Sequence, residues 1–206
     1  MSALKMVKPS PSMELVIGEL EKSLAVMENN YQKAITNLSL LKNHVENDDL
    51  TKLLRRGAFL SKLQNFLDSS KRENREVQIM MIDVDRFKSV NDKFGHQTGD
   101  VVLERVSSLI KKYLRPEDLA GRYGGEEIIV AIQSEFSTAV EIAERIRIAV
   151  AEYKMRSADQ REFNVTLSIG IASSGAFDFE AQRLIGRADA AMYAAKNEGR
   201  DRVRIR

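Results

Sequence analysis

The sequence predicts a three-layer α/β (α+β) domain in which helices flank a central mixed sheet of about five strands, preceded by a long coiled-coil helix. Short apolar runs typical of strands alternate with longer amphipathic stretches typical of helices. Two adjacent glycines, Gly124 and Gly125, separate two of these runs, as expected for a hairpin. Upstream, apolar residues recur every three or four positions from Met13 to Val45.

Composition limits the classes of protein to consider. At 206 residues and 43% hydrophobic content, the chain is long enough for one domain with its own core plus an extension. The 32 basic and 30 acidic residues give a net charge of +2, so no basic field indicates nucleic-acid binding. The absence of cysteine excludes a disulfide scaffold and fits a reducing compartment, so the cytoplasm is expected. Since no apolar run could span a bilayer, we expect no direct membrane insertion.

The N-terminal quarter divides into a flexible leader, residues 1–12, and a helix over residues 13–47. A seam only two positions wide is typical of a parallel dimeric coiled coil, so we expect a dimerisation and signalling rod about 50 Å long. A single amphipathic helix packed on its own domain is the alternative. The a positions are Ile17, Leu24, Tyr31, Leu38 and Val45, and the d positions are Met13, Leu20, Met27, Ala34 and Leu41.

Residues 48–206 form the predicted domain. Asp100 suits the start of a helix, Gly199 suits the end of one, and the Gly124-Gly125 pair is expected at positive φ in a hairpin. Helices are expected at Arg55–Leu67, Arg86–Phe94, Asp100–Tyr113, Thr138–Tyr153 and Ala181–Lys196, with a loop at Gly95–Gly99, and strands at Val77–Asp83, Asp118–Tyr123, Glu126–Ile132, Phe163–Ala172 and near Val203.

Acidic residues occupy the ends of two strands that we expect to be neighbours. One strand runs into Asp83-Val84-Asp85, and the hairpin leads into Glu126-Glu127. Because side chains alternate along a strand, one carboxylate of each pair faces a given side, and we select Asp83 and Glu126. With the Val84 carbonyl, these oxygens suit Mg²⁺ carrying a phosphate ester.

The residues after this strand suit a bound triphosphate. Arg86, Phe87 and Lys88 form the first turn of a helix, where backbone N–H groups are unpaired and attract anions. The alternative for Lys88 is a solvated helix lysine. At the C-terminus, Lys196 and Arg200 would neutralise β- and γ-phosphates, although Lys196 could simply complement the helix dipole.

The glycine-bracketed stretch from Asn91 to Asp100 suits recognition of a purine edge. Asn91 can donate and accept, while Asp100 can accept from the ring N–H and exocyclic amine that distinguish guanine from adenine. A site of this kind rejects the wrong base because buried polar groups would be left unpaired. The alternative is that Asp100 is only the N-cap of the following helix.

These motifs agree in order and spacing with one family, and the chain from Asp48 onward resembles the bacterial diguanylate cyclases, whose GGDEF domain is named for its signature. The family's signature Phe is Ile128 here, and Lys52 and Arg55 replace the usual Gly and Asn of the entrance. The matching segments are Asp48–Thr51 for the Asp-x-Leu-Thr entrance, Asp83–Lys88 for the metal strand, Asn91–Asp100 for the guanine loop, Arg122–Ile128 for the signature and Asp189–Arg200 for the closing helix.

The resemblance implies roles for these positions. Glu127 is a candidate general base or second-metal ligand, and Lys88 a candidate catalytic lysine. Asp100, in place of the Ser found in a branch that makes mixed dinucleotides, favours two GTP as substrates. The implied sets are Asp83, the Val84 carbonyl and Glu126 for Mg²⁺ (Mn²⁺ as an alternative), Asn91 and Asp100 for guanine, and Lys196, Arg200 and the Arg86 and Phe87 amides for phosphate.

The implied reaction condenses two GTP into cyclic di-GMP with loss of two pyrophosphates. Since each domain holds one GTP, two copies must meet, and the N-terminal rod would make them a homodimer. Arg115 and Asp118 resemble the family's Arg-x-x-Asp product-inhibition site, with Arg145 or Arg147 completing it; a surface salt bridge is the alternative. A regulatory protein is expected on the N-terminal helix. The rival functions are a catalytically silent receptor for cyclic di-GMP and a coiled-coil scaffold.

Overall fold

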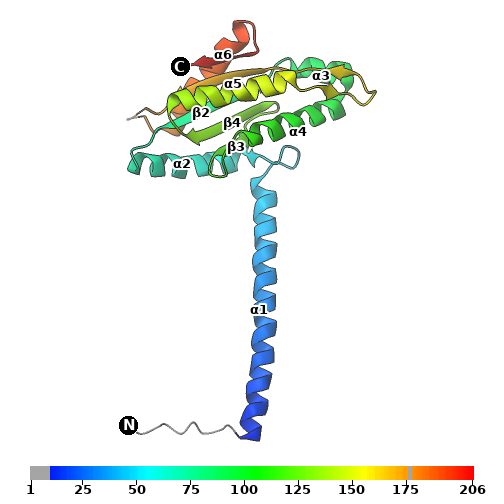
Figure 1. The fold of residues 1–206 in the computed structure, drawn as a ribbon, viewed down its shortest axis with the longest axis vertical. Coiled ribbons are helices and arrows are strands. Elements are labelled where there is room, and N and C mark those ends of the chain that lie inside the picture. The colour runs from blue at the N-terminus through cyan, green and yellow to red at the C-terminus, as the bar shows by residue number, and fades with distance from the viewer. Residues whose placement is uncertain (1–9, 176–177) are drawn as a thin grey trace. The chain divides into compact units, whose positions relative to one another are not determined.

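The structure is a computed structural model that describes residues 10–175 and 178–206, without the side chains of residues 37–45. The chain divides into two compact units, Met1–Val45 and Glu46–Arg206 (Figure 1). Most of the predicted leader, residues 1–9, lies outside the described residues. No helix in the described part of the chain is long and apolar enough to cross a membrane.

The N-terminal unit is the helix α1 (Pro11–Glu46). It begins two residues before the predicted start at Met13, because Ser10 and Pro11 form its N-terminus. The Ser10 carbonyl accepts from the N–H groups of Met13 (2.9 Å) and Glu14 (3.0 Å). Pro11 suits the first helical position, where its missing N–H costs nothing.

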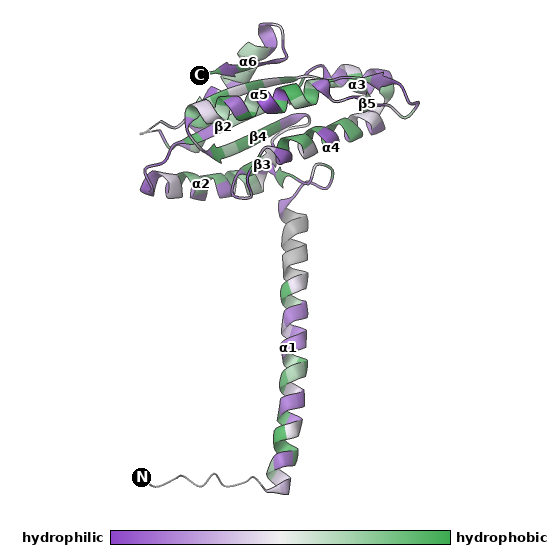
Figure 2. Ribbon diagram, viewed as in Figure 1, coloured by the Kyte–Doolittle hydropathy of each residue, from purple (hydrophilic) through white to green (hydrophobic). Residues whose placement is uncertain are grey.

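The apolar side chains described on α1 are exposed in the single chain, and Figure 2 colours the ribbon of α1 green at its hydrophobic residues. Leu20, Leu24 and Tyr31 of the predicted seam are 58%, 53% and 65% exposed. The exposed set also includes Leu15, Val16, Val26 and Ile35, which lie off the seam, so the apolar surface is wider than the heptad pattern. Leu38, Leu41 and Val45 lie outside the residues whose side chains are described.

The second unit is built on a six-stranded mixed sheet, one strand more than predicted, because the two-residue β1 joins its edge. The long central strand β2 is antiparallel to both of its neighbours, whereas the edge strands β1 and β8 each pair in parallel. The order across the sheet is β1 (Leu54–Arg55), β3 (Leu119–Arg122), β4 (Glu127–Gln133), β2 (Val77–Val84), β7 (Leu167–Ser173) and β8 (Arg202–Ile205).

Five helices cover the sheet and complete the three predicted layers (Figure 1). Side chains of β2 alternate between two apolar clusters: Met80 and Ile82 join one, Ile79 and Met81 the other. The first cluster contains α3 (Phe87–Phe94), α4 (His96–Lys112) and α5 (Phe136–Glu152), and the second contains α2 (Arg56–Arg72) and α6 (Ala181–Asn197). The predicted fold class is therefore confirmed.

Two predicted segments are wrong in detail. The loop expected over Gly95–Gly99 is absent, because Gly95 alone, at φ 83°, separates α3 from α4. Asp100 consequently lies inside α4 and is not its N-cap. The strand expected at Phe163–Ala172 is divided: β6 (Glu162–Phe163) pairs with β5 (Met155–Arg156) in a separate hairpin, and β7 begins only at Leu167.

Candidate active site

The pairing of β2 with β4 brings the acidic ends of these two strands together. In the antiparallel pairing of β2 with β4, Asp83 lies directly opposite Glu127. Opposed residues share a face of the sheet, and Asp83 shares the parity of Met81, so both carboxylates lie on the α6 face. Glu126 precedes β4 at the hairpin tip. The register therefore pairs Asp83 with Glu127, where strand alternation had suggested Glu126.

Asp83 is buried, with 4% of its surface exposed. Its Oδ2 lies 2.7 Å from Nζ of Lys196, which projects from the last turn of α6. Burial raises the pKa of Asp83 to about 6; the hydrogen bond and charge of Lys196 oppose this, and the charges of Glu126 and Glu127 add to it. The charges of Glu126 and Glu127 thus add to the one that Lys196 neutralises at Asp83, an arrangement that favours a further cation.

The hairpin tip is braced by Arg122, at the end of β3. Its Nη1 donates to both carboxylate oxygens of Asp48 at 3.2 Å, while Nε and Nη2 donate to the Gly125 carbonyl at 3.2 and 2.8 Å. Asp48 also accepts from the backbone N–H and hydroxyl of Thr51. Burial raises the pKa of Asp48, but these bonds bring it below its ordinary value. The entrance turn and the signature hairpin form one hydrogen-bonded unit.

The signature glycines do not have the predicted left-handed backbone. The glycines at positive φ among the described residues are Gly95, Gly175 and Gly199. Gly124 is required for a different reason: a Cβ there would collide with the Glu127 carboxylate, whereas a Cβ on Gly125 would meet nothing within 4 Å. The Gly124 position therefore makes room for Glu127.

Asp85, two residues beyond Asp83, has a structural position. Its carboxylate accepts from the hydroxyls of Thr166 (2.7 Å) and Ser168 (2.6 Å) and from the backbone N–H of Asp201 (3.0 Å). These bonds tie the end of β2 to β7 and to the turn before β8. Since three donors occupy its oxygens, Asp85 is a poor candidate for a metal ligand, in agreement with the choice of Asp83.

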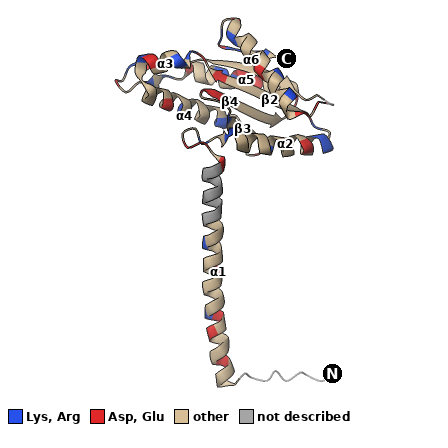
Figure 3. Ribbon diagram, turned by 180° about the vertical axis from the view of Figure 1, so that it is seen from behind, with Lys and Arg blue, Asp and Glu red and all other residues tan. Residues whose placement is uncertain are grey.

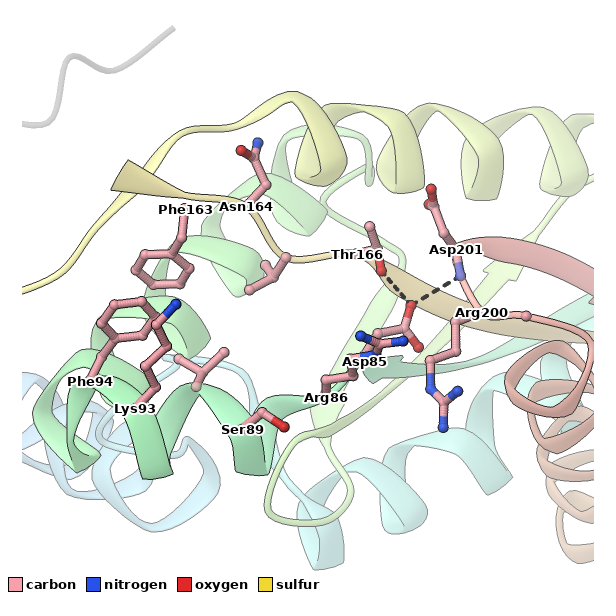
Figure 4. Close-up of a pocket in the computed structure, with 13 residues that line it drawn as sticks. Asp85, Arg86, Ser89, Lys93, Phe94, Phe163, Asn164, Thr166, Arg200 and Asp201 are labelled. Atoms are coloured by element: carbon pink, nitrogen blue, oxygen red, sulfur yellow. Dashed lines mark hydrogen bonds between the residues drawn. The ribbon is translucent and has the colours of Figure 1, made fainter. Parts of the chain in front are cut away.

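A cavity of about 380 Å³ adjoins this strand end. Figure 4 shows Asp85, Arg86 and Arg200 at one end of it and the stacked rings of Phe94 and Phe163 at the other, with centroids 4.5 Å apart. Arg86, the residue before α3, has a left-handed backbone at φ 56°. Arg86 and Arg200 bring positive charge to the cavity next to the first turn of α3, where anions are favoured.

Asn91 and Gly99 are in close contact where α3 meets α4. The Oδ1 atom of Asn91 is buried without a hydrogen-bond partner, and a Cβ on Gly99 would collide with it. Gly99 therefore makes room for the Asn91 side chain, whose Oδ1 atom accepts no hydrogen bond from the described residues. Asp100 follows on the exposed side of α4, and Lys88 is exposed on α3. A ligand with N–H groups would satisfy the Asn91 acceptor.

The predicted inhibitory residues lie at the start of β3, in a separate place. Asp118 Oδ2 accepts from the backbone N–H of Arg115 at 2.8 Å, and burial raises the pKa of Asp118. Both residues line a cavity of about 460 Å³ together with Lys52 and Lys111, so positive charge is concentrated there. Lys52 has φ 56°, which explains why glycine is usual at this position.

The two arginines left open for that site differ in their contacts. Arg145 is 65% exposed and pairs with Glu141 at 3.5 Å. Arg147 binds Glu144 and Asp201, both at 2.7 Å. Arg147 is thus tied to the turn that carries Arg200. Sequence reasoning missed this contact, and the one between Arg122 and Asp48, because long-range ion pairs have no local signal.

Among residues 10–175 and 178–206, no group of three or more His, Asp or Glu side chains has the arrangement of a metal cluster. The expected set contains only two carboxylates, Asp83 and Glu126, with the Val84 carbonyl as third ligand. Oxygen ligands of this kind suit Mg²⁺. The buried, acid-rich surroundings of Asp83 fit such an ion.

The sequence was also compared with models of known protein families. Residues 45–202 match the family model described as "Diguanylate cyclase, GGDEF domain". The chain belongs to this family. Figure 3 shows basic and acidic residues interspersed along the ribbon of this domain.

Named relatives agree with this assignment. The chain is 42% identical over 177 residues to diguanylate cyclase A of Treponema denticola, with 84% of this chain and 47% of that protein covered. It is 37% identical over 191 residues to diguanylate cyclase DosC of Escherichia coli, covering 89% of this chain and 41% of the relative. The chain thus spans less than half the length of these curated relatives.

Solved structures include both units of the chain. The coiled coil and GGDEF domain of DgcB from Caulobacter crescentus, in complex with c-di-GMP, has a TM-score of 0.81 at 29% identity, covering 91% of this chain and 99% of that one. Diguanylate cyclase SiaD from Pseudomonas aeruginosa, in complex with its activator SiaC, has a TM-score of 0.77 at 33% identity, covering 95% and 75%.

Proposed function

We propose that this chain is a diguanylate cyclase that condenses two GTP into cyclic di-GMP and two pyrophosphates. The observation that carries the proposal is the buried carboxylate of Asp83, paired with Lys196 and facing the two glutamates of the signature hairpin. A buried carboxylate close to two half-buried acids is costly unless a cation joins them. Membership of the family supplies the chemistry that such a site performs.

Asp83, Glu126 and the Val84 carbonyl would hold Mg²⁺, with Mn²⁺ as an alternative. When bound, this ion supplies positive charge to the phosphates of the nucleotide. Lys196 already neutralises one oxygen of Asp83, and its ammonium lies close enough to contact a phosphate bound beside it.

Guanine recognition is assigned to Asn91 and Asp100. The unpartnered Oδ1 of Asn91 would accept from the exocyclic amine of guanine, and the exposed Asp100 carboxylate from a ring N–H. Adenine does not present this pair of donors. A site whose buried acceptor stays unpaired with the wrong base discriminates strongly against it.

The phosphates would lie between the start of α3 and the end of α6. The amides of Arg86 and Phe87 would bind them as N–H groups at the start of α3, and Lys196 and Arg200 would add two positive charges. Lys88, exposed on α3, is assigned to the same phosphates. These groups position the α-phosphate for in-line attack.

In the chemical step, the 3′-oxygen of one GTP attacks the α-phosphorus of the other, and the bond to pyrophosphate breaks. The proton of the 3′-hydroxyl must be removed, and Glu127, held beside Asp83 by the strand register, is our candidate for the base. Two such steps, one in each direction, close the ring. Because one domain binds one GTP, two domains must face each other.

The helix α1 would bring the two domains together. Its apolar side chains are exposed in one chain, and a parallel coiled coil would bury them. The matching structure of DgcB contains a coiled coil joined to the same kind of domain. Tethering makes the encounter of two domains intramolecular and raises their effective concentration. By analogy with SiaD, which binds its activator SiaC, we propose that a regulatory protein acts on this helix.

Incubation of the purified chain with GTP and Mg²⁺, followed by chromatography, tests the proposal. We expect cyclic di-GMP from the native chain and a loss of roughly a hundredfold or more in Glu126→Gln. Glu162→Gln, an exposed acid on β6, is the control. Both variants should remain dimeric in analytical ultracentrifugation. Binding of cyclic di-GMP without turnover by the native chain would identify a silent receptor, and full activity of Glu126→Gln would reject the metal assignment.

Product inhibition is assigned to Arg115 and Asp118. The cationic cavity beside them suits the two phosphates of cyclic di-GMP. Loss of one charge-assisted hydrogen bond in Arg115→Ala should raise the product concentration for half-inhibition by about tenfold or more. Initial rates at increasing cyclic di-GMP measure this change. Unaltered inhibition in the variant would move the inhibitory site elsewhere.

A further inference from the structure

The turn between α6 and β8 has an unusual backbone. Gly199, Arg200 and Asp201 are at φ 120°, 65° and 46°. Two consecutive non-glycine residues in the left-handed region are uncommon, and such a conformation persists only where its surroundings fix it. The strained turn carries Arg200, which we assign to the phosphates.

Two contacts hold the turn at Asp201. Its backbone N–H donates to Asp85 Oδ2 at 3.0 Å, and its Oδ1 accepts from Arg147 Nη1 at 2.7 Å. Arg147 comes from α5 and is itself fixed by Glu144, which accepts from its Nε at 2.7 Å. The Arg147 side chain is 19% exposed, so its pair with Asp201 is better shielded from solvent than the Arg145–Glu141 pair of the same helix.

Arg200 is left available by this arrangement. Within the described part of the chain, its guanidinium has no hydrogen bond or ion pair, and its side chain extends beside Arg86 at one end of the cavity (Figure 4). A rigidly held backbone with a free cationic side chain is suited to meet an anion. The direction of that side chain depends on the conformation of the turn, which is held at Arg200 by a bond from its N–H to the Ala195 carbonyl at 3.0 Å and at Asp201 by Asp85 and Arg147.

We infer that Arg147 is a positioning residue for substrate binding: by holding Asp201, it aims Arg200 at the terminal phosphates of bound GTP. This inference rests on the proposed function. It assigns Arg147 to the active site, where the sequence had left it as a candidate for the inhibitory site. It also explains why an arginine of α5 reaches a turn 54 residues away.

Binding of three guanine nucleotides tests the inference. Titration calorimetry with guanosine 5′-(α,β-methylene)triphosphate, which cannot release pyrophosphate, is compared with GDP and GMP. Arg147→Gln should weaken the triphosphate by about tenfold, as loss of a supporting contact does, and leave GMP within about twofold. Arg156→Gln is the matched control, because Arg156 also pairs with a carboxylate, Glu162 at 3.0 Å, and neither residue lines the cavity.

A double-mutant cycle separates positioning from general destabilisation. If Arg147 acts through Arg200, the double variant should bind the triphosphate no more weakly than Arg200→Gln alone. Arg147→Lys, which can still reach Asp201, should recover part of the affinity, and it replaces Arg147→Gln if that variant does not fold. Equal losses for GMP and the triphosphate, or additive effects, would overturn the inference alone. No effect of Arg200→Gln would overturn the proposed phosphate contact as well.

Discussion

Asp83 is a buried carboxylate whose ionisation opposes folding. Burial raises its pKa to about 6 in the folded chain, whereas its ordinary value of 3.8 applies to the unfolded chain. The folded state therefore holds the proton more tightly, and between these values it binds more protons than the unfolded state. Stability must then fall as pH rises through this window and level off above it.

Asp83→Asn should remove this pH dependence. Relative to the variant, the native chain should lose up to about 3 kcal/mol of unfolding free energy as pH rises from 4 to 7, since each pKa unit corresponds to about 1.4 kcal/mol. Urea unfolding at a series of pH values measures the difference. A constant difference between the two proteins would contradict the raised pKa. Added Mg²⁺ should stabilise the native chain above pH 6 and leave the variant nearly unchanged.

At the level of single residues, the sequence indicated which side chains lie together better than it indicated backbone conformations. Asp83 and Lys196 were both named for one site, and they form an ion pair. The left-handed backbone at Lys52 and Arg86 was not predicted, because neither residue type signals positive φ. The bonding of Arg122 to Asp48 was not predicted, because the two residues are 74 positions apart in the sequence.

The signature hairpin is an element whose two glycines have different functions. Gly124 lies against the Glu127 carboxylate, while Gly125 has open space around its Cα. A side chain at Gly124 meets only the far end of a flexible glutamate, so the collision moves Glu127 at little cost to the fold.

Gly124→Ala should therefore reduce catalysis more than stability. We expect kcat to fall by about tenfold or more through the displaced Glu127, with unfolding free energy changed by less than about 1 kcal/mol. Gly125→Ala is the matched control and should retain most of the activity. Initial-rate kinetics and thermal unfolding of both variants decide the matter. Equal activity of the two would show that the position of Glu127 is unimportant.

Among the elements, long periodic segments were predicted and short ones were not. The long strand β2 and the helices α5 and α6 lie within two residues of their predicted bounds at each end. The two-residue strands β1, β5 and β6 are too short to show any periodicity. The start of α4 was misplaced because the glycines near it indicated a loop, although Gly99 is there to accommodate Asn91.

For the whole molecule, activity should depend on the association of two chains through α1. Leu20→Asp with Leu24→Asp places charge in the predicted seam, whereas Lys22→Asp alters the opposite side of the helix. The seam variant should sediment as a monomer. At submicromolar protein its activity should fall by about a hundredfold, because the tether no longer supplies a high effective concentration. Full activity of a monomeric seam variant would show that catalysis does not require association through α1.

At the scale of the fold, alternation of strands and helices was sufficient to predict three layers. It could not predict the complete order of the strands, because pairing depends on contacts distant in sequence. The hairpin of β3 and β4 was predicted from Gly124 and Gly125. The adjacency of β2 and β4, on which the site depends, was expected from the sandwich fold and is confirmed by their antiparallel pairing.

The edge strand β8 has a consequence for crowded cells. An unpaired strand edge invites another sheet to add to it, which is a common route to insoluble aggregates. β8 is only four residues long and carries Arg202 and Arg204, which form ion pairs with Glu198. A short edge strand bearing charged side chains discourages the joining of two sheets along this border.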